Sequence, residues 1–350
     1  MYRYVSEKND GSLGVDKIIS VANMYFKPDA RISDEEYLRT YNVFRLGDIA
    51  FEGNKSKIFA FGRFVENTIG DGIVSHVFVV FRPLHHDHNL GYWKYAINNE
   101  NVMGRILARC TKKTTMMTNL VSDDFLEEEM FCPSNAEQRK ISSFLELLER
   151  KIDAQIKLVE HLKKYKRGLL EAIFNQKIHV TDSNEEWQEC RIGDILKILH
   201  GRDYKDYRAT NGAYPVLGTG GVIDHATKYL CDWPCVLIGR KGTIDKPQYM
   251  DKPFWTVDTL FYSKPESSHN PKFQYYLFQT INWKKYNEAS GVPSQSSSTI
   301  EGINVYVPNL KTQEAIANLF SQIDELIDDY SVVLAHLQDY KKGLVQKLFI

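Results

Sequence analysis

The longest regular pattern of hydrophobic positions occurs twice, once in the middle of the chain and once at its C-terminal end. In both stretches apolar residues recur every three, four or seven positions, which is typical of a long helix that packs against another helix in a coiled coil. At ~1.5 Å per residue, a helix of about forty residues is roughly 60 Å long. The positions are Ile141, Leu145, Leu148, Ile152, Val159, Leu162, Leu169 and Ile173, and then Ile316, Phe320, Ile323, Ile327, Leu334, Leu337, Leu344 and Leu348.

The two helical stretches also repeat each other at a constant offset of 175 residues, without a gap, and the repeat includes residues outside the hydrophobic pattern. LKKYKRGLLEAIF at 162–174 returns as LQDYKKGLVQKLFI at 337–350. A coiled coil alone gives no reason to repeat its outward residues, so the repeat favours a partner that is met twice. Gly168 and Gly343 each destabilise a helix by about 1 kcal/mol relative to Ala, which predicts a close backbone approach at both, either between the helices or with a partner.

Outside the helices, short apolar or alternating runs end at Gly or charged residues, which indicates strands and turns. Examples are the runs at 41–51, 72–81, 214–221, 235–242 and 255–262. The two strand-rich parts do not keep the offset of the helices, because Pro83 corresponds best to Pro265, 182 residues later. We therefore expect two globular parts that are similar in kind and have diverged in detail. The two helices have stayed alike, whereas the two domains have diverged. This suggests a protein that binds the same partner twice and recognises two different targets.

The composition is that of an ordinary globular protein, with 43% hydrophobic residues, a formal net charge of −1 and a pI of about 6.8. A DNA-binding function would therefore depend on local basic patches, or on partners that supply positive charge. Five cysteines without a CxxC motif give no disulfide framework. No signal peptide and no apolar run of roughly 18 residues is present, so a reduced, cytoplasmic protein without a membrane contact is expected.

These motifs resemble those of the specificity subunit of type I restriction–modification systems, over essentially the whole chain. In that family a target-recognition domain is followed by a P…EQ..I helix that ends in a K(K/R)GL…F phrase, and both then occur again. The matching residues are Pro133, Glu137, Gln138, Ile141, Lys166–Leu169 and Phe174, then Pro308, Gln313, Ile316, Lys341–Leu344 and Phe349, with Trp187, RIGDI at 191–195, YPVLGTGG at 214–221, IGRKG at 238–242 and PFWTVDTLF at 253–261.

Two departures from the family pattern stand out. The first domain lacks the Trp-x-LGDI type of opening, and the chain begins at a point some twenty residues further into the domain. Thr312 stands where the family has the Glu of the EQ pair. The substitution removes one helix-cap partner, and the loss destabilises the helix by roughly 0.5–2 kcal/mol at most.

The resemblance implies an α+β fold in which two globular mixed α/β target-recognition domains are joined by two long helices packed as an antiparallel coiled coil. The expected boundaries are 1–132 for the first domain, 133–177 for the first spacer helix, 178–307 for the second domain and 308–350 for the second helix. It implies a non-enzymatic subunit that recognises a bipartite double-stranded DNA target, one half per domain, with the helices fixing the gap. Two methyltransferase subunits, and two restriction subunits that can join them, would carry S-adenosylmethionine, ATP and Mg, so this chain would hold no cofactor and no metal.

DNA reading needs hydrogen-bonding side chains on loops that reach base edges, together with Lys and Arg on phosphates. The candidates in the first domain are Asn54, Lys55, Lys57, Arg63, Ser75, His76, Lys112 and Lys113. Those in the second domain are Arg202, Arg240, Lys241, Thr243, Ser294, Gln295 and Ser296. The repeated helix positions could form the joint between the helices or a methyltransferase surface, which the sequence does not separate. They are Tyr165, Lys166, Arg167, Gly168 and Phe174, with Tyr340, Lys341, Lys342, Gly343 and Phe349.

Three alternatives stay open at this point. The chain could be the specificity chain of a system whose partner combines methyltransferase and nuclease, a coiled-coil adaptor that never meets DNA, or a self-contained nuclease or methyltransferase. The last has no GxxxxGK phosphate loop and no Asn- or Asp-Pro-Pro-aromatic motif in its favour. The adjacent histidines at 85–88 lack a Cys partner for a metal site.

Overall fold

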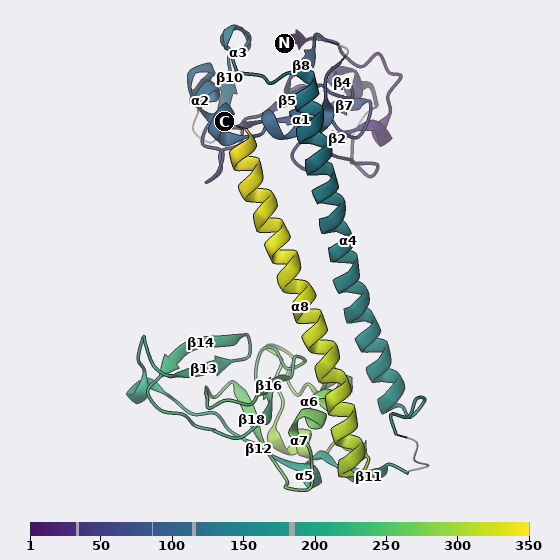
Figure 1. Cartoon of the computed structure of the whole chain (residues 1–350), viewed down its shortest axis with the longest axis vertical. Coiled ribbons are helices and arrows are strands. Elements are labelled where there is room, and N and C mark those ends of the chain that lie inside the picture. Colours follow the sequence, from purple (N-terminus) through teal and green to yellow (C-terminus); the bar gives the residue numbers. More distant parts are fainter. Residues whose placement is uncertain (33–34, 86, 114–116, 182–185, 350) are drawn as a thin grey trace. The chain divides into compact units, whose positions relative to one another are not determined.

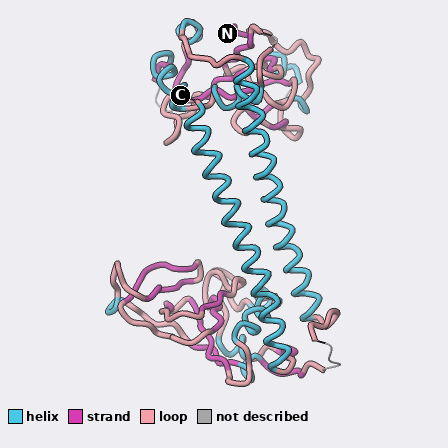
Figure 2. The backbone as a smooth tube through the Cα atoms, in the orientation of Figure 1, coloured by secondary structure: helices cyan, strands magenta, loops and turns pink. Residues whose placement is uncertain are grey.

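The computed structural model describes residues 1–350 except 33–34, 86, 114–116, 182–185 and 350. The chain divides into two units, which we call unit 1 (Met1–Ile156 with Val332–Ile350) and unit 2 (Lys157–Ser331). Two long helices, α4 (Asn135–Phe174) and α8 (Leu310–Leu348), each contribute one half to each unit. Figure 1 shows α4 in teal and α8 in yellow, and Figure 2 shows that the remaining secondary structure of both units is a mixture of strands and short helices.

Unit 1 is built on an antiparallel four-stranded sheet of order β1-β8-β5-β6. Three two-stranded sheets, β2-β3, β4-β7 and β9-β10, and the helices α1, α2 and α3 complete it. The bounds are β1 Tyr2–Val5, η1 Val15–Lys17, β2 Ile19–Ser20, β3 Tyr25–Phe26, η2 Glu35–Thr40, β4 Asn42–Phe44, β5 Ile49–Glu52, β6 Arg63–Glu66, β7 Gly72–Val74, β8 Val79–Pro83, α1 Leu90–Ala96, α2 Glu100–Cys110, β9 Thr111–Lys113, β10 Thr118–Leu120 and α3 Ser122–Glu127.

Unit 2 contains a sheet of the same kind, in the order β12-β18-β15-β16, together with a β14-β13-β17 sheet and a β11-β19 pair. The bounds are β11 Gln188–Arg191, α5 Ile192–Ile195, β12 Leu196–Leu199, η3 Lys205–Tyr207, β13 Tyr214–Gly218, β14 Gly221–Ala226, β15 Cys235–Gly239, β16 Gln248–Met250, β17 Trp255–Thr256, β18 Leu260–Pro265, α6 Pro271–Thr280, η4 Trp283–Tyr286, α7 Ser297–Glu301 and β19 Asn304–Val307.

The strand registers show how the two units correspond. Tyr2 lies opposite Pro83 in unit 1, and Leu196 lies opposite Pro265 in unit 2. The match of Pro83 with Pro265 predicted from the sequence is therefore confirmed, and β1 corresponds to β12. Within the described residues, unit 1 has no counterpart of β11 and α5, which precede β12 in unit 2.

The cores explain why these segments fold as they do. In unit 1, the apolar faces of β5, β6 and β8 pack against α2 and α3 through Phe51, Phe64, Phe81, Leu107 and Phe125. In unit 2, the largest core joins strands to α6 and to both long helices, and includes Ile238, Phe261, Phe273, Leu170 and Phe320. In unit 1 the long helices contribute to a further core, in which Leu145 of α4 packs with Trp93 of α1. The hydrophobic pattern of the long helices thus serves one core in each unit.

The start of each long helix is fixed by a cap. The backbone N–H of Ser134 donates to Glu137 (3.0 Å), and the N–H of Glu137 lies 3.4 Å from the Ser134 hydroxyl, which is a capping box. At the start of α8, Asn309 accepts from the N–H of Thr312 (3.0 Å), so the Glu-to-Thr departure leaves this helix capped.

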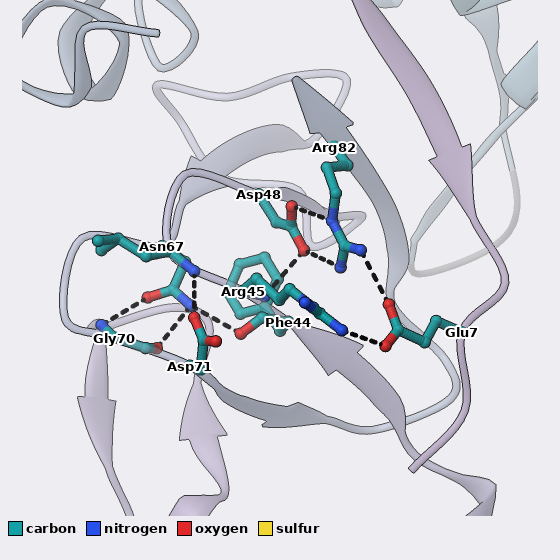
Figure 3. Close-up of polar contacts among 9 residues, drawn as sticks. Glu7, Phe44, Arg45, Asp48, Asn67, Gly70, Asp71 and Arg82 are labelled. Carbon is teal, nitrogen blue, oxygen red and sulfur yellow. Dashed lines mark hydrogen bonds and ion pairs between the residues drawn. The ribbon is translucent and has the colours of Figure 1, made fainter. Parts of the chain in front are cut away.

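An ion network around the buried Asp48 stabilises the sheet of unit 1 (Figure 3). Asp48 has no exposed surface and binds the guanidinium of Arg82 at 2.9 and 2.8 Å. Arg82 also donates to Glu7 (2.8 Å), which binds Arg45 (2.6 Å). Burial raises the pKa of Asp48 despite these partners, so the carboxylate depends on Arg82 for its charge compensation.

The predicted fold class is confirmed, because each unit is a mixture of helix and sheet and the long helices pack antiparallel in both. Cys231, Cys235 and Trp255 lie in the core. The residue boundaries of the four predicted segments stay predictions, since the division into two units passes through both long helices.

Candidate nucleic-acid interface

The loops that carry the predicted DNA contacts of unit 2 lie at one edge of its four-stranded sheet. Because the strands are antiparallel, β12 and β15 end at the same edge where β18 and β16 begin. Arg202 follows β12, and Arg240, Lys241 and Thr243 follow β15. Backbone hydrogen bonds join these loops to their neighbours: Arg202 N to Thr256 O (2.8 Å), Arg240 N to Thr259 O (2.8 Å), Gly242 N to Pro293 O (2.8 Å) and Gln295 N to Arg240 O (3.0 Å). The structure therefore brings together candidates that lie up to 94 positions apart between Arg202 and Ser296.

The side chains at this edge differ in what they can contact. Arg202 and Lys241 are exposed, whereas Thr243 and Ser294 are half-buried. Arg240 is engaged in an ion pair with Asp258 at 2.5 Å, so a phosphate contact by its guanidinium has to compete with this carboxylate. The exposed Arg202 and Lys241 are therefore the better placed cations for DNA.

Gln295 and Ser296 have structural contacts in this unit. Gln295 is 3% exposed, and its amide donates to the carbonyl of Gly239 (2.8 Å). The hydroxyl of Ser296 caps α7 by accepting from the N–H of Thr299 (3.2 Å). The Gln295 side chain holds the Ser-rich loop against β15, and the Ser296 hydroxyl is engaged at the start of α7. Among the three candidates of this loop, Ser294 therefore keeps the most direct access to a ligand.

The corresponding edge of unit 1 carries the other candidates. Thr118 N donates to the carbonyl of Gly53 (2.9 Å), which joins the β9-β10 hairpin to the loop after β5. This contact places Lys112 and Lys113 near Asn54. Ser75 and His76 lie in the turn before β8, at the edge where β5 ends. The exposed candidates are Asn54, Lys55, Lys57, His76, Lys112 and Lys113.

Arg63 differs from these exposed side chains. Its Nε donates to Glu52 (2.7 Å), its Nη2 donates to the carbonyl of Ala22 (2.9 Å), and its side chain is 23% exposed. Arg63 therefore joins β5 to β6 and to the segment after β2. Like Arg240 in unit 2, it is paired with a carboxylate at the sheet edge.

The loops after β5 and after β15 occupy equivalent places. Ala50 lies opposite Val80 as Leu237 lies opposite Tyr262, which makes Asn54 the counterpart of Lys241. Both positions form an isolated backbone bridge to a later loop, Asn54 with Met117 and Lys241 with Ser294. The same sheet edge is thus built twice, with different side chains on it.

The repeated helix positions separate into inward and outward groups. Lys166 forms an ion pair with Asp324 (2.6 Å) in unit 2, and Lys341 forms one with Glu149 (2.7 Å) in unit 1. The acids are repeat partners, as the lysines are, because both pairs differ by 175 positions. The same interhelical contact is therefore formed in each unit, with the roles of the two helices exchanged.

Each of these ion pairs is completed by a tyrosine that the sequence analysis missed. Tyr95 donates to Glu149, with the ammonium of Lys341 5.4 Å from its ring centre. Tyr276 donates to Asp324 (2.8 Å), with the ammonium of Lys166 5.2 Å from its ring centre. We call these two tyrosine–acid–lysine groups the clamps. Their signal in the sequence is the recurrence of the two tyrosines 181 positions apart, close to the offset of Pro83 and Pro265.

The clamp in unit 1 predicts a dependence of stability on pH. Burial alone would raise the pKa of Glu149, but hydrogen bonds from Lys341, Lys94 and Tyr95 outweigh it and lower the pKa to about 2, from an ordinary value of 4.5. Because the folded-state pKa is depressed, the stabilisation is present above pH 4.5 and is lost as the pH falls towards 2.

We expect the free energy of unfolding of unit 1 to decrease over that pH range, and Glu149→Gln to flatten this part of the profile. Denaturant titrations at several pH values measure both. Glu146→Gln, one turn earlier on an exposed face, is the control and should leave the profile unchanged. An equal flattening by Glu146→Gln would contradict the role of the clamp.

Phe174 and Phe349 also point inward. The ring of Phe174 packs on Phe273 (5.4 Å between centroids) in unit 2, and that of Phe349 packs on Tyr92 (5.1 Å) in unit 1. These aromatic residues anchor the C-terminal ends of α4 and α8 to the globular part of each unit.

The outward group forms one exposed face on each helix. Leu158, His161, Tyr165 and Gly168 follow one another at steps of three and four and lie at the surface of unit 2. Their repeat partners Val333, His336, Tyr340 and Gly343 form the same face in unit 1. Tyr165 and Tyr340 are 60% and 56% exposed. We call these faces the outer stripes; Arg167 and Lys342 lie exposed beside them.

The predicted close backbone approach at the two glycines is not found between the helices. Among the described residues, apart from the chain neighbours and the nearby backbone of the same helix, no atom lies within 4 Å of a Cβ atom added to Gly168 or Gly343. The glycines lie on the outer stripes and face away from the helix joint. Contact with a partner, the alternative that the sequence left open, stays a prediction.

Three further observations concern other chemistry. Among the described residues, which do not include His86, no group of three or more His, Cys, Asp or Glu side chains is placed to hold a metal ion. The thiols of Cys231 and Cys235 lie 3.9 Å apart in the core of unit 2. None of the helices in the described parts of the chain is long and apolar enough to cross a membrane.

Comparison with known proteins gives a family match in the second half of the chain. Residues 184–330 match the model of the type I restriction modification DNA specificity domain. The type I restriction enzyme MjaVIII specificity subunit of Methanocaldococcus jannaschii is 25% identical over 181 residues, which cover 47% of this chain and 42% of that protein. The EcoprrI specificity subunit of Escherichia coli is 20% identical over 243 residues, 65% of this chain and 61% of that protein. The matches thus span about half the length of these relatives.

Solved structures show the same fold. The type I restriction–modification S subunit from M. genitalium covers 100% of this chain and 93% of its own, with a TM-score of 0.61 and 17% identity. The HsdS subunit from Thermoanaerobacter tengcongensis covers 99% of this chain and 96% of its own, with a TM-score of 0.52 and 15% identity. Residues 184–330 therefore belong to the family of type I restriction modification DNA specificity domains, and the chain resembles type I specificity subunits in sequence and in fold.

Proposed function

We propose that the chain is the DNA sequence-specificity subunit of a type I restriction–modification complex and recognises a bipartite double-stranded DNA target. The observation that carries this proposal is the sheet edge that is built twice, with loops in equivalent places and different side chains on them. Each edge would read one half of the target. Exposed lysines and Arg202 would contact phosphates, and the polar side chains would contact base edges.

The long helices would set the distance between the two half-sites. The clamps support this role. Each unit contains one clamp, and its ion pair joins α4 to α8 and fixes the register of the two helices in that unit. An antiparallel pair made of two repeats would have an approximate two-fold axis, as duplex DNA has, so both half-sites could be met from one face. A fixed gap in the DNA target is the functional counterpart of a fixed helix register.

The outer stripes would dock two methyltransferase subunits, one on each stripe. Support comes from the exposed tyrosines and from the glycines, which are repeated although no side chain among the described residues packs on them. Two restriction subunits would join this assembly. S-adenosylmethionine, ATP and Mg would bind to the partners, and this chain would act in the cytoplasm, with no catalysis of its own.

The glycines give a test of the docking. Gly168→Ala and Gly343→Ala together should stabilise the free chain by up to about 2 kcal/mol, because Ala is favoured in a helix by about 1 kcal/mol at each position. The same substitutions should weaken assembly with the methyltransferase subunit, since a methyl group is added where the partner approaches. Thermal unfolding measures the first effect and analytical ultracentrifugation the second.

A matched control is Glu160→Ala, which lies on another exposed face of α4. It should leave assembly unchanged. Assembly that is unaffected by the two glycine substitutions would remove the outer stripes from the partner surface.

The activity is tested by methyl transfer. The chain is co-expressed with the methyltransferase subunit encoded beside it, and the purified complex is supplied with labelled S-adenosylmethionine and host DNA. We expect transfer by the complex and none by either protein alone. Transfer by the isolated chain would support a self-contained enzyme instead, and the lack of any complex would favour the coiled-coil adaptor. DNA cleavage by the same partner polypeptide would identify the system with a combined partner.

A further inference from the structure

Two aliphatic side chains of unit 2 are exposed next to each other on the β13-β14 hairpin. Val222 is 58% exposed and Ile223 is 55% exposed. They are the second and third residues of β14, directly after the turn of the hairpin, where Gly218 lies opposite Gly221. Figure 1 shows β13 and β14 side by side in unit 2. Because neighbouring strand residues point to opposite faces, the hairpin presents one aliphatic side chain on each face.

The turn of this hairpin lies at the sheet edge that carries the predicted DNA contacts of unit 2. β13 runs parallel to β17, and β17 leads directly to the start of β18 at this edge, so β13 ends there as well. The N–H of Val257 donates to the carbonyl of Leu217 (3.2 Å), near the end of β13. The carbonyl of the preceding residue, Thr256, accepts from the N–H of Arg202 (2.8 Å). Both contacts are made by one peptide group, which places the end of β13 close to Arg202.

A second set of contacts joins the turn to the loop after β15. The side-chain amide of Gln248, at the start of β16, donates to the carbonyls of Gly218 (3.3 Å) and Thr219 (3.4 Å). A Cβ atom added to Gly242 would lie 3.8 Å from the hydroxyl of Thr219. Since Gly242 directly follows the exposed Lys241, the turn is held beside both exposed candidate cations of this edge.

A third exposed aliphatic side chain flanks the same loops. Val292 is 57% exposed, and the next residue, Pro293, accepts from the N–H of Gly242 (2.8 Å). Apolar residues exposed singly are common on protein surfaces, but here three flank the loops of one sheet edge. Two of them lie on β14, which is an edge strand of its sheet, and exposed aliphatic residues on such a strand favour association with another molecule. This pattern indicates a ligand that offers apolar groups next to negative charge.

Double-stranded DNA offers that combination in its major groove. The phosphates are negative, and the C5 methyl of thymine is an apolar group among the base edges of this groove. The groove admits a two-stranded β-ribbon and is about 8.5 Å deep. At ~3.3 Å per residue, Val222 and Ile223 lie within about 7 Å of the paired glycines at the turn. Only Thr219 and Gly220 connect these glycines, so the turn is narrow, and both aliphatic side chains would lie inside the groove.

We propose that the β13-β14 hairpin enters the major groove of the half-site that unit 2 reads, with its turn first, and that Val222 and Ile223 contact the methyl groups of thymines there. Arg202 and Lys241, beside the turn, bind the neighbouring phosphates. The inference rests on the proposed function and adds a chemical preference to it, because unit 2 then selects A·T pairs by the methyl group of thymine.

Uracil substitution tests the proposal, because uracil keeps the pairing and hydrogen-bonding groups of thymine and lacks only its methyl group. The complex of the full-length chain with the methyltransferase subunit encoded beside it is titrated with duplexes of its target. The target comes from sequencing methylated adenines, and the half read by unit 2 is the half that changes when the loops of unit 2 are exchanged. Each thymine of this half is replaced by uracil in turn.

We expect at least one uracil duplex to bind about fourfold more weakly than the thymine duplex, which is the effect of losing one buried methyl group at about 0.8 kcal/mol. Equal binding of all uracil duplexes would overturn the proposal, and so would a target without an A·T pair in this half.

A comparison with a variant chain assigns the effect to the hairpin. Val222→Ser combined with Ile223→Ser should weaken binding of the thymine duplex, and this chain should bind the thymine and uracil duplexes equally. Both side chains are exposed, so thermal unfolding of the chain should be unchanged. Tyr306→Ser is the matched control, since it removes a side chain that is 49% exposed on β19, outside the sheets that carry these loops. It should leave the preference for thymine intact.

The outcomes separate this inference from the proposed function. A preference for thymine that the Val222→Ser, Ile223→Ser chain retains would overturn the inference and leave the proposed function in place. Loss of assembly of this chain with the methyltransferase subunit would identify the hairpin as a protein contact and also overturn the inference. Absence of any sequence-specific DNA binding by the original complex would contradict both.

Discussion

Replacing Arg82 by Met is expected to lower the free energy of unfolding of unit 1 by about 3–5 kcal/mol, because it leaves the carboxylate of Asp48 buried without its counter-charge. Asp48 has no exposed surface, and Arg82 is its ion-pair partner (2.8 Å). Met fills a similar volume, so packing is largely kept and the lost charge compensation dominates. Denaturant unfolding, monitored by hydrogen exchange in β1, β5 and β8, measures the change in unit 1 alone.

Arg45 provides the matched control. It binds Glu7 (2.6 Å), but the side chains are 51% and 36% exposed, and exposed ion pairs contribute about 0–1 kcal/mol. Arg45→Met should therefore have a small effect. Adding Asp48→Asn to Arg82→Met should recover part of the loss, since the buried charge is then removed as well. Equal losses of unfolding free energy for Arg82→Met and Arg45→Met would show that the contribution of these ion pairs to stability does not depend on the burial of Asp48.

Reversing the charge of the two exposed cations of unit 2, with Arg202→Glu and Lys241→Glu, is expected to abolish target methylation by the assembled complex. Each lost phosphate contact should reduce the slope of log K against log salt by about 1, and the new carboxylates repel the backbone in addition. Fluorescence titrations of the complex with target DNA at several salt concentrations measure the slope. Assembly with the methyltransferase subunit should be unchanged, because neither residue lies on an outer stripe.

Lys264→Glu is the control for this pair. Lys264 is exposed on β18 near its C-terminal end, at the sheet edge opposite the candidate loops. Reversal of its charge should leave the salt slope and the methylation unchanged. If Lys264→Glu had the same effect as the paired substitution, DNA binding would depend on overall charge and not on the sheet edge.

The long helices could be predicted from the sequence because two independent signals coincide there. The spacing of apolar residues such as Leu145 and Phe320 indicates a helix face, and the offset of 175 indicates that the face is used twice. The partners in the clamps could not be predicted. Tyr95 and Tyr276 reach Glu149 and Asp324 from distant segments, and a single polar residue on a helix carries no sign of which segment folds onto it.

The candidate interface was predictable as a set of loops and not as individual side chains. Polar residues after apolar runs, such as Lys241 and Asn54, indicate loops at a sheet edge, and the structure places them there. Gln295 has the same local pattern, yet its amide is buried against Gly239. The repeated Gly168 likewise indicates an unusual requirement without saying on which side of the helix it applies, so the sequence could not separate an approach between the helices, which the structure does not show, from contact with a partner.

The central claim, that the two units read the two halves of one DNA target, is tested most directly by sequencing methylated adenines in the host genome. The host is compared with and without this chain, in the presence of the adjacent methyltransferase subunit, and then with the loops of unit 2 exchanged for those of a relative. We expect a split motif with a fixed gap that appears only with this chain, and a loop exchange that changes one half of the motif while the other half and the gap stay the same. A continuous motif, or an exchange that alters both halves together, would contradict the account.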